Sequence, residues 1–141
     1  MKNILLILLV NCCFLTAALA QVTRTASQTI TAGTATTVNL DLGSNDVEIA
    51  ETKGSRIIVE ASIGLDKLDN VNLLEFVIKT GRYELESKLD NTTQTLTITR
   101  KKNLNILMVK GQECKENVKY KILIPSSVKF VHQGGSTASI N

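Results

Sequence analysis

The chain has 141 residues, with 16 Lys and Arg against 13 Asp and Glu and a formal net charge of +3. This length suits one domain with its own hydrophobic core. Because basic and acidic residues are nearly equal in number, the chain does not provide a broad basic surface. We therefore expect no nucleic-acid partner and no strongly basic membrane-binding face. The densest basic run, Arg100-Lys101-Lys102, is short and is typical of a solvated turn.

The first 20 residues have the pattern of an export signal. Lys2 gives a positive start, an unbroken apolar run extends from Ile4 to Val10, and Ala18-Leu19-Ala20 has small residues where a signal peptidase requires them. We expect cleavage between Ala20 and Gln21, which leaves residues 21–141 as a single β-rich domain. This domain is then exported, to the periplasm or the cell surface of a Gram-negative bacterium.

Two alternatives to this cleavage stay open. A retained membrane anchor would need about 20 apolar residues, but Asn11 interrupts the run and the chain turns polar after Ala20. Lipidation at Cys12 or Cys13 would tether the domain, because Leu9-Val10-Asn11-Cys12 has the outline of a lipidation box. Without lipidation, we expect contact with a membrane only through the signal.

Beyond the signal, alternating apolar and polar residues predict an all-β domain. Val38, Leu40 and Leu42 alternate with polar neighbours, as in strands that bury one face and expose the other. Segments rich in Gly, Pro, Ser and Asn separate such runs. The expected strands are Val38 to Leu42, Val47 to Ile49, Arg56 to Ala61, Tyr83 to Ser87, Thr95 to Thr99, Ile106 to Val109, Val118 to Ile124 and Val128 to His132.

One segment departs from this alternation. Asn72 and Glu75 form a capping pair, and Gly81 stands where a helix would end. We therefore expect a short helix from Leu73 to Thr80 that covers the core. Its apolar face would consist of Leu73, Leu74, Val77 and Ile78. The alternative is a strand with Leu74, Phe76 and Ile78 on one face.

A short repeat relates the two ends of the domain. Val38-Asn39-Leu40, followed by Gly43-Ser44, is similar to Val128-Lys129-Phe130 followed by Gly135-Ser136. Successive rungs of a β-solenoid repeat in this way. We therefore expect a solenoid-like single β-helix, a stack of short strands with one short helix. A β-sandwich is the alternative, since its hairpins would produce similar sequences.

The order of these segments resembles the bacterial "putative adhesin" domain family. The resemblance spans most of Gln28 to Asn141 and depends on the strand order and on Tyr120-Lys121-Ile122-Leu123-Ile124-Pro125 before a Gly-Ser corner. Members are exported cell-envelope proteins related to autotransporter adhesin head domains. The resemblance implies an all-β, solenoid-like fold, and it brings no catalytic residues to this chain.

Few residues here are suited to catalysis. Once the signal is removed, Cys114 is the only cysteine, so a core rather than a disulfide must stabilise the fold. It lies in a polar stretch and is typical of a tolerated small residue. His132, the only histidine, is expected at a strand end without a nucleophile elbow. Glu84 and Glu86 share a strand face, where solvent-facing charges are commoner than a glycosidase pair.

Two kinds of binding site stay open. Asp41-Leu42-Gly43-Ser44-Asn45-Asp46 gathers oxygen ligands around a glycine, as calcium requires, although turn chemistry explains the same residues. Sugars stack on exposed aromatic rings. Because Phe76 and Phe130 are expected in the core, Tyr83 is the remaining candidate platform. We expect neither a metal nor a cofactor.

Together these features predict an exported, non-enzymatic, adhesin-like or interaction domain of the bacterial cell envelope. Its partner would be a protein or a surface ligand recognised through strand faces or a sheet edge. The alternative is a periplasmic structural or envelope-stress-linked protein without an adhesive role.

Overall fold

The computed structural model describes residues 22–43, 46–68, 70–102 and 104–132. The predicted export signal, with its expected cleavage between Ala20 and Gln21, lies outside them. The described residues form one helix, α2 (Val71–Lys79), and ten strands. The strands are β1 (Thr23–Thr31), β2 (Thr37–Asp41), β3 (Asp46–Thr52), β4 (Arg56–Leu65), β5 (Leu85–Asp90), β6 (Thr95–Arg100), β7 (Met108–Val109), β8 (Gln112–Glu113), β9 (Glu116–Pro125) and β10 (Lys129–His132).

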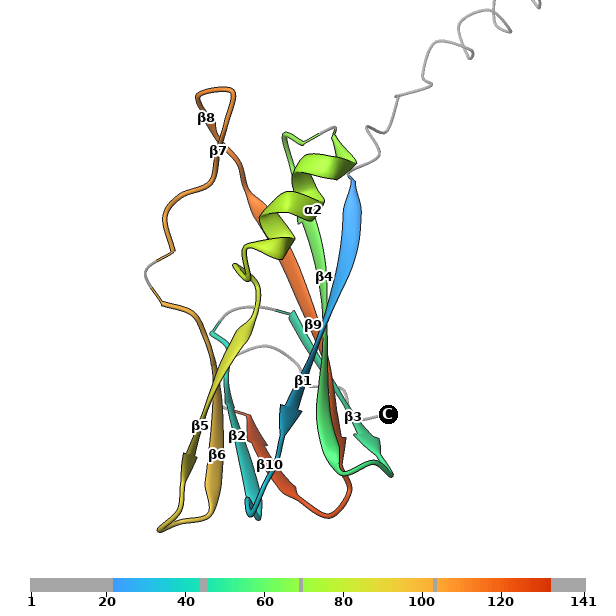
Figure 1. The fold of residues 1–141 in the computed structure, drawn as a ribbon, viewed down its shortest axis with the longest axis vertical. Helices are drawn as coiled ribbons and strands as arrows, with labels where there is room; N and C mark the ends of the chain where they lie inside the picture. Colours follow the sequence, from blue (N-terminus) through green and yellow to red (C-terminus); the bar gives the residue numbers. More distant parts are fainter. Residues whose placement is uncertain (1–21, 44–45, 69, 103, 133–141) are drawn as a thin grey trace, which may run out of the picture.

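Eight of these strands form two four-stranded sheets in a sandwich-like arrangement (Figure 1). The strand order is β1-β4-β9-β3 in one sheet and β10-β2-β6-β5 in the other, while β7 and β8 form a separate hairpin. Neither order returns to its first strand, so neither sheet is closed. Buried residues from both sheets make up one hydrophobic cluster.

The sheets do not show the expected single β-helix. β2 does lie parallel to both β6 and β10, and β3 lies parallel to β9, as solenoid rungs would. However, β4 runs antiparallel to both of its neighbours, β1 and β9, and β5 runs antiparallel to β6. A solenoid adds each rung in parallel, so these long antiparallel strands favour the sandwich alternative. The mostly β architecture is confirmed.

The repeat between the two ends of the domain is partly explained by this topology. Its first halves, in β2 and β10, are adjacent parallel strands, with Phe130 beside Val38. The second copy from Gly135 onward lies outside the described residues. The two copies are therefore neighbours in one sheet, but out of step by two residues, because the repeat matches Phe130 with Leu40 whereas the sheet pairs Phe130 with Val38.

Alternation of apolar residues becomes alternation of burial in the central strands. In β4, Ile57, Val59, Ala61 and Ile63 are buried, and the residues between them are more exposed. In β1, by contrast, only Ile30 is buried. This polar strand at the sheet edge was missing from the expected set, because a strand paired on one side needs few apolar residues.

Helix α2 confirms the expected helix but begins earlier. Asn70, not Asn72, is the N-cap, and its side chain accepts a hydrogen bond from the Asn72 amide over 2.9 Å. Gly81 follows the helix with φ +71°, as a residue ending a helix often does. Within the described residues, no helix combines the length and apolar character needed to span a bilayer.

Candidate functional site

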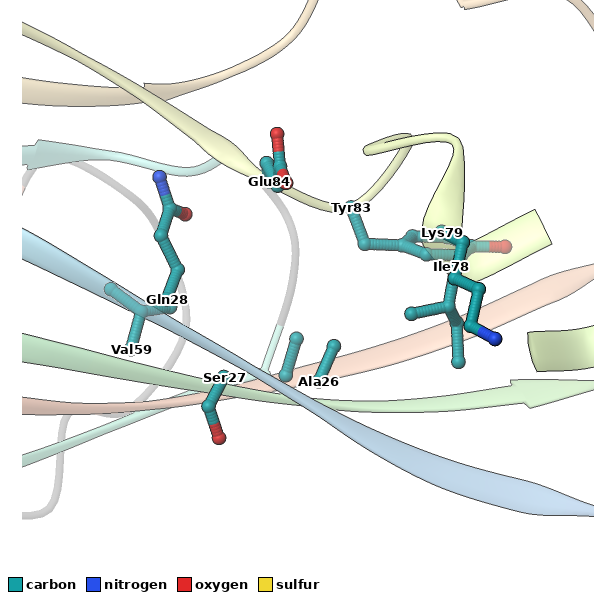
Figure 2. Close-up of a pocket in the computed structure, with 9 residues that line it drawn as sticks. Ala26, Ser27, Gln28, Val59, Ile78, Lys79, Tyr83 and Glu84 are labelled. Carbon is teal, nitrogen blue, oxygen red and sulfur yellow. The ribbon is translucent and has the colours of Figure 1, made fainter. Parts of the chain in front are cut away.

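A pocket opens between β1 and the segment that leaves α2 (Figure 2). Its volume is about 300 Å³. Ala26 and Val59 belong to the sheet, whereas Ile78 and Tyr83 approach from the other side. The complete lining is Ala26, Ser27, Gln28, Val59, Ala61, Ile78, Lys79, Tyr83 and Glu84. Three elements distant in sequence therefore make a largely apolar hollow.

Gln28 joins the two sheets beside this pocket. Its side-chain Nε2 donates to the Leu85 carbonyl over 2.8 Å, and its Oε1 accepts from the Leu85 amide over 2.9 Å. This exchange imitates a hydrogen-bonded pair of antiparallel residues. It links β1 to the start of β5 without a shared ladder, so the amide stabilises the fold and is not available to a ligand.

The other polar groups of the pocket differ in their availability. Glu84 is paired with the Lys101 ammonium at 3.5 Å, and the Tyr83 hydroxyl donates to Glu116. No hydrogen bond or ion pair joins the Lys79 ammonium to another described residue. Ser27 points away from Tyr83 and Glu84 in Figure 2. The pocket therefore offers apolar contact and one unpaired cation.

A charged cluster fixes the segment between α2 and β5. Arg82 donates to both carboxylate oxygens of Glu116, from Nε over 2.7 Å and from Nη2 over 2.8 Å. Its Nη2 also donates to the Asn105 carbonyl over 2.6 Å, and the Tyr83 hydroxyl donates to Glu116 over 2.7 Å. These bonds connect the end of α2 with the start of β9 and with the segment before β7.

Burial and charge shift the pKa values in this cluster. Burial by itself would raise the pKa of Glu116, but hydrogen bonds from Arg82 and Tyr83 and the Arg82 charge lower it below its ordinary value. Burial, reinforced by the bond to Glu116, raises the pKa of Tyr83. The hydrogen bond to Glu116 likewise raises the pKa of Arg82. Glu116 is therefore an anion and Tyr83 a neutral donor near neutral pH, a structural pairing and not an acid–base pair poised for proton transfer.

Exposed apolar side chains occur on α2 and on the segment that enters the β7–β8 hairpin, two elements that lie at the same end of the molecule (Figure 1). On α2, Phe76 is 65% exposed and Leu73 is 42% exposed; at the hairpin, Ile106 is 66% and Met108 is 56% exposed. We refer to these four residues as the apolar end. The Arg82 bond to Asn105 ties the two contributing segments together.

The structure places the other candidate residues apart from one another. Glu84 and Glu86 are exposed, as expected, although Glu84 precedes β5. His132 is the last residue of β10, in the opposite sheet from Ser27. Part of the Asp41–Asp46 calcium candidate, residues 44 and 45, lies outside the described residues. No group of three or more His, Cys, Asp or Glu side chains suited to a metal ion occurs in the part of the chain that the structure describes.

The structure rules out two interpretations of single residues, and it buries a third residue whose exposure the sequence did not indicate. Tyr83 is 4% exposed and cannot stack on a sugar. Phe76, expected in the core, is on the outer face of α2. Cys114 is 3% exposed, because its amide bonds to the Leu107 carbonyl over 2.9 Å and draws the residue inward. The polar sequence around it gave no signal of this burial.

The chain shows similarity to known proteins in its structure rather than in its sequence. No family model matches the chain, and no curated protein matches its sequence. Among solved structures, the chain is similar to the crystal structure of a putative cell adhesion protein from Clostridium sporogenes, with a TM-score of 0.44 and 10% identity. The match covers 80% of this chain and 47% of that protein, so this chain spans about half of its length.

Proposed function

We propose that the protein is an exported, non-enzymatic interaction module of the cell envelope that acts in an adhesin-like way through its apolar end. The observation that carries this proposal is the exposure of Phe76 at 65% and Ile106 at 66% on a domain whose two sheets bury most of their large apolar side chains. Exposed apolar clusters on soluble domains commonly mark interaction surfaces. The export signal predicted in residues 1–20 supports an envelope setting.

The energetics suit a weak contact repeated over a surface. Burying each large side chain of the apolar end would contribute about 2 kcal/mol before the entropic cost of association. Such a contact is weak for a single copy but strengthens when many copies engage together. The pocket beside Gln28 pairs no hydroxyl with a free carboxylate, because the Tyr83 hydroxyl donates to Glu116, Glu84 is paired with Lys101, and Ser27 points away from Glu84 (Figure 2).

The test compares binding of the exported protein to isolated cell envelopes. Phe76→Ser and Ile106→Ser are expected to reduce envelope binding several-fold. Val131→Ser, which changes a 49% exposed residue on β10, is the matched control and should bind as the parent does. Equal binding by all four proteins, or no binding by the parent, would refute the proposal.

Two measurements on the same cells separate this role from a periplasmic structural one. N-terminal sequencing identifies cleavage after Ala20 or lipidation at Cys12 or Cys13. External protease should digest the protein on intact cells if it faces outward, and should leave it untouched if it serves inside the periplasm.

A further inference from the structure

We propose that the apolar end docks on an anionic lipid surface, with Phe76, Ile106 and Met108 entering the acyl-chain boundary and nearby lysines contacting lipid phosphates. This inference rests on the proposed function and names the chemistry of its partner. It also revises the expectation that membrane contact occurs only through the signal or a lipid anchor.

The apolar side chains stand on two elements held in fixed relation. Leu74 anchors α2 in the core, which leaves Phe76 on the opposite face of the helix. In the hairpin, Lys110 and Gly111 have φ values of +50° and +77°, as in tight two-residue turns that join antiparallel strands. This turn carries Met108 at its base. Such protruding apolar side chains can enter a fluid lipid layer without a preformed concave partner.

The charges around the apolar end favour an anionic partner. Lys110 lies in the hairpin turn, and Lys67 and Lys115 lie in neighbouring connections. None of the three ammonium groups forms an ion pair with a described acidic side chain, although the Lys115 amide donates to Asp66 over 2.8 Å. The nearby Glu75 and Glu116 are already paired with Arg24 and Arg82. Asp66 and Glu113, the latter paired across the hairpin with Met108, offset two of these three lysine charges and leave a net positive charge of one. Lysines beside anionic lipids each contribute about 1 kcal/mol, and their alkyl chains tolerate the interface.

A retained or lipidated N-terminus, the alternative to cleavage after Ala20, would favour lipid over other anionic partners. β1 begins at Thr23 at the same end as α2 (Figure 1). The apolar run from Ile4 to Val10 comes shortly before it in the sequence. If that run is retained, or if Cys12 or Cys13 is lipidated, the tether joins the domain at this end. The apolar end would then lie next to the bilayer, where its insertion costs little additional entropy.

A second copy of the chain is a poorer partner for this surface. Docking two apolar ends would bring Lys67 and Lys110 of each copy close to those of the other, and like charges repel. The β7–β8 hairpin also protrudes from the molecule (Figure 1), so two such ends do not complement each other in shape.

A single tryptophan reports insertion directly, because the natural chain has none. The exported protein is purified with its N-terminus determined, in three forms: Ile106→Trp, Phe76→Trp and Asn91→Trp. Asn91 is exposed in the turn between β5 and β6, at the far end of the molecule (Figure 1). Each form is mixed with phosphatidylcholine vesicles, with or without phosphatidylglycerol, that carry brominated acyl chains as quenchers.

We expect quenching at positions 106 and 76 only with phosphatidylglycerol and at low salt, and no quenching at position 91. Adding Lys110→Gln should weaken vesicle binding about fivefold, and adding Met108→Ser to the position-106 reporter should weaken it by about tenfold. Vesicle binding without quenching at 106, equal quenching at 91, or insensitivity to lipid charge would overturn the inference. So would a fluorescence shift with polyglutamate but not with vesicles, which would assign the surface to an acidic polypeptide. If envelopes bind in the earlier test while lipid vesicles do not, the proposed function stands and only the lipid assignment fails.

Discussion

Replacing Glu116 with Gln should destabilise the protein by about 2–3 kcal/mol, because the side chain loses its charge while keeping its shape. Glu116 accepts from Arg82 at 2.7 and 2.8 Å and from Tyr83 at 2.7 Å. An amide has one acceptor oxygen, so its NH2 would face a donor of Arg82. The side chains of Arg82 and Glu116 are only 14% and 23% exposed, so water replaces these bonds poorly.

Urea unfolding, followed by circular dichroism and tyrosine fluorescence, measures this effect. The matched control is Glu113→Gln, an exposed glutamate of β8, which should change the free energy of unfolding by less than about 0.5 kcal/mol. A double-mutant cycle with Arg82→Met should give a coupling energy of about 1–3 kcal/mol. Additive effects, or equal stability of the parent and the Glu116 variant, would refute the assigned geometry.

The stability difference between the parent and the Glu116→Gln variant should also depend on pH. The pKa of Glu116 in the folded state is below its ordinary value of 4.5. The contribution of the Glu116 charge to stability is therefore fully present above the pKa of Glu116 in the unfolded chain. It is lost as the pH falls through the pKa of Glu116 in the folded protein. The stability difference between parent and Glu116→Gln should be constant near neutral pH and should shrink below about pH 4.5. A difference that stays equally large in acid would mean that charge is not its source.

Two further substitutions and one labelling experiment test other contacts. Gly81→Ala should cost about 1–2 kcal/mol, because φ is +71° and an added Cβ would lie 2.8 Å from the Glu84 carboxylate; thermal unfolding measures this, and an unchanged midpoint would contradict the conformation. Gln28→Glu should cost about 1–3 kcal/mol in urea unfolding, because a carboxylate cannot donate to the Leu85 carbonyl, whereas Ser27→Ala beside it should be nearly neutral. Cys114 should resist alkylation in the folded protein and react only after unfolding, as mass spectrometry of its peptide would show; rapid labelling of the native protein would contradict its 3% exposure.

The central strands were predictable because the alternation of apolar and polar residues that marks a half-buried strand lies within the strand itself. β9 places Val118, Tyr120, Ile122 and Ile124 on one buried face, and this period of two is visible without a structure. What that period does not encode is the neighbour of each strand. The parallel pairing of β2 with β10 and the antiparallel pairing of β4 with β9 depend on long-range packing, so the sequence led to a solenoid where the sheets form a sandwich-like pair.

The candidate sites were less predictable, because they combine distant segments. The pocket beside Gln28 brings together β1, β4 and the end of α2, and the polar sequence of β1 did not even predict a strand. The Arg82–Glu116 pair joins residues 34 positions apart. Burial of Cys114 likewise depends on a bond to Leu107 across the hairpin.

The choice between helix and strand for this segment determines whether Phe76 is a core residue or an exposed residue available for binding. In the strand alternative, Leu74, Phe76 and Ile78 share one face and all would be core. In the observed helix, successive residues turn by about 100°, so Phe76 lies roughly opposite Leu74 and faces outward while Leu74 is fully buried. The capping signals that favoured the helix therefore already implied an exposed phenylalanine.

That exposure is not explained by packing among the described residues. Leu74 is buried and Val77 and Ile78 pack against the core, so α2 would keep these contacts with a polar residue at position 76. The Arg82 bonds to Glu116 and Asn105 hold the helix end and the segment before β7 in place, which keeps the exposed side chains of both segments directed away from the core. The free energy of unfolding of a Phe76→Ser protein, measured in urea, should therefore equal that of the parent to within about 0.5 kcal/mol. The same protein should nevertheless bind envelopes several-fold more weakly. Loss of stability in parallel with binding would instead show that Phe76 serves the fold.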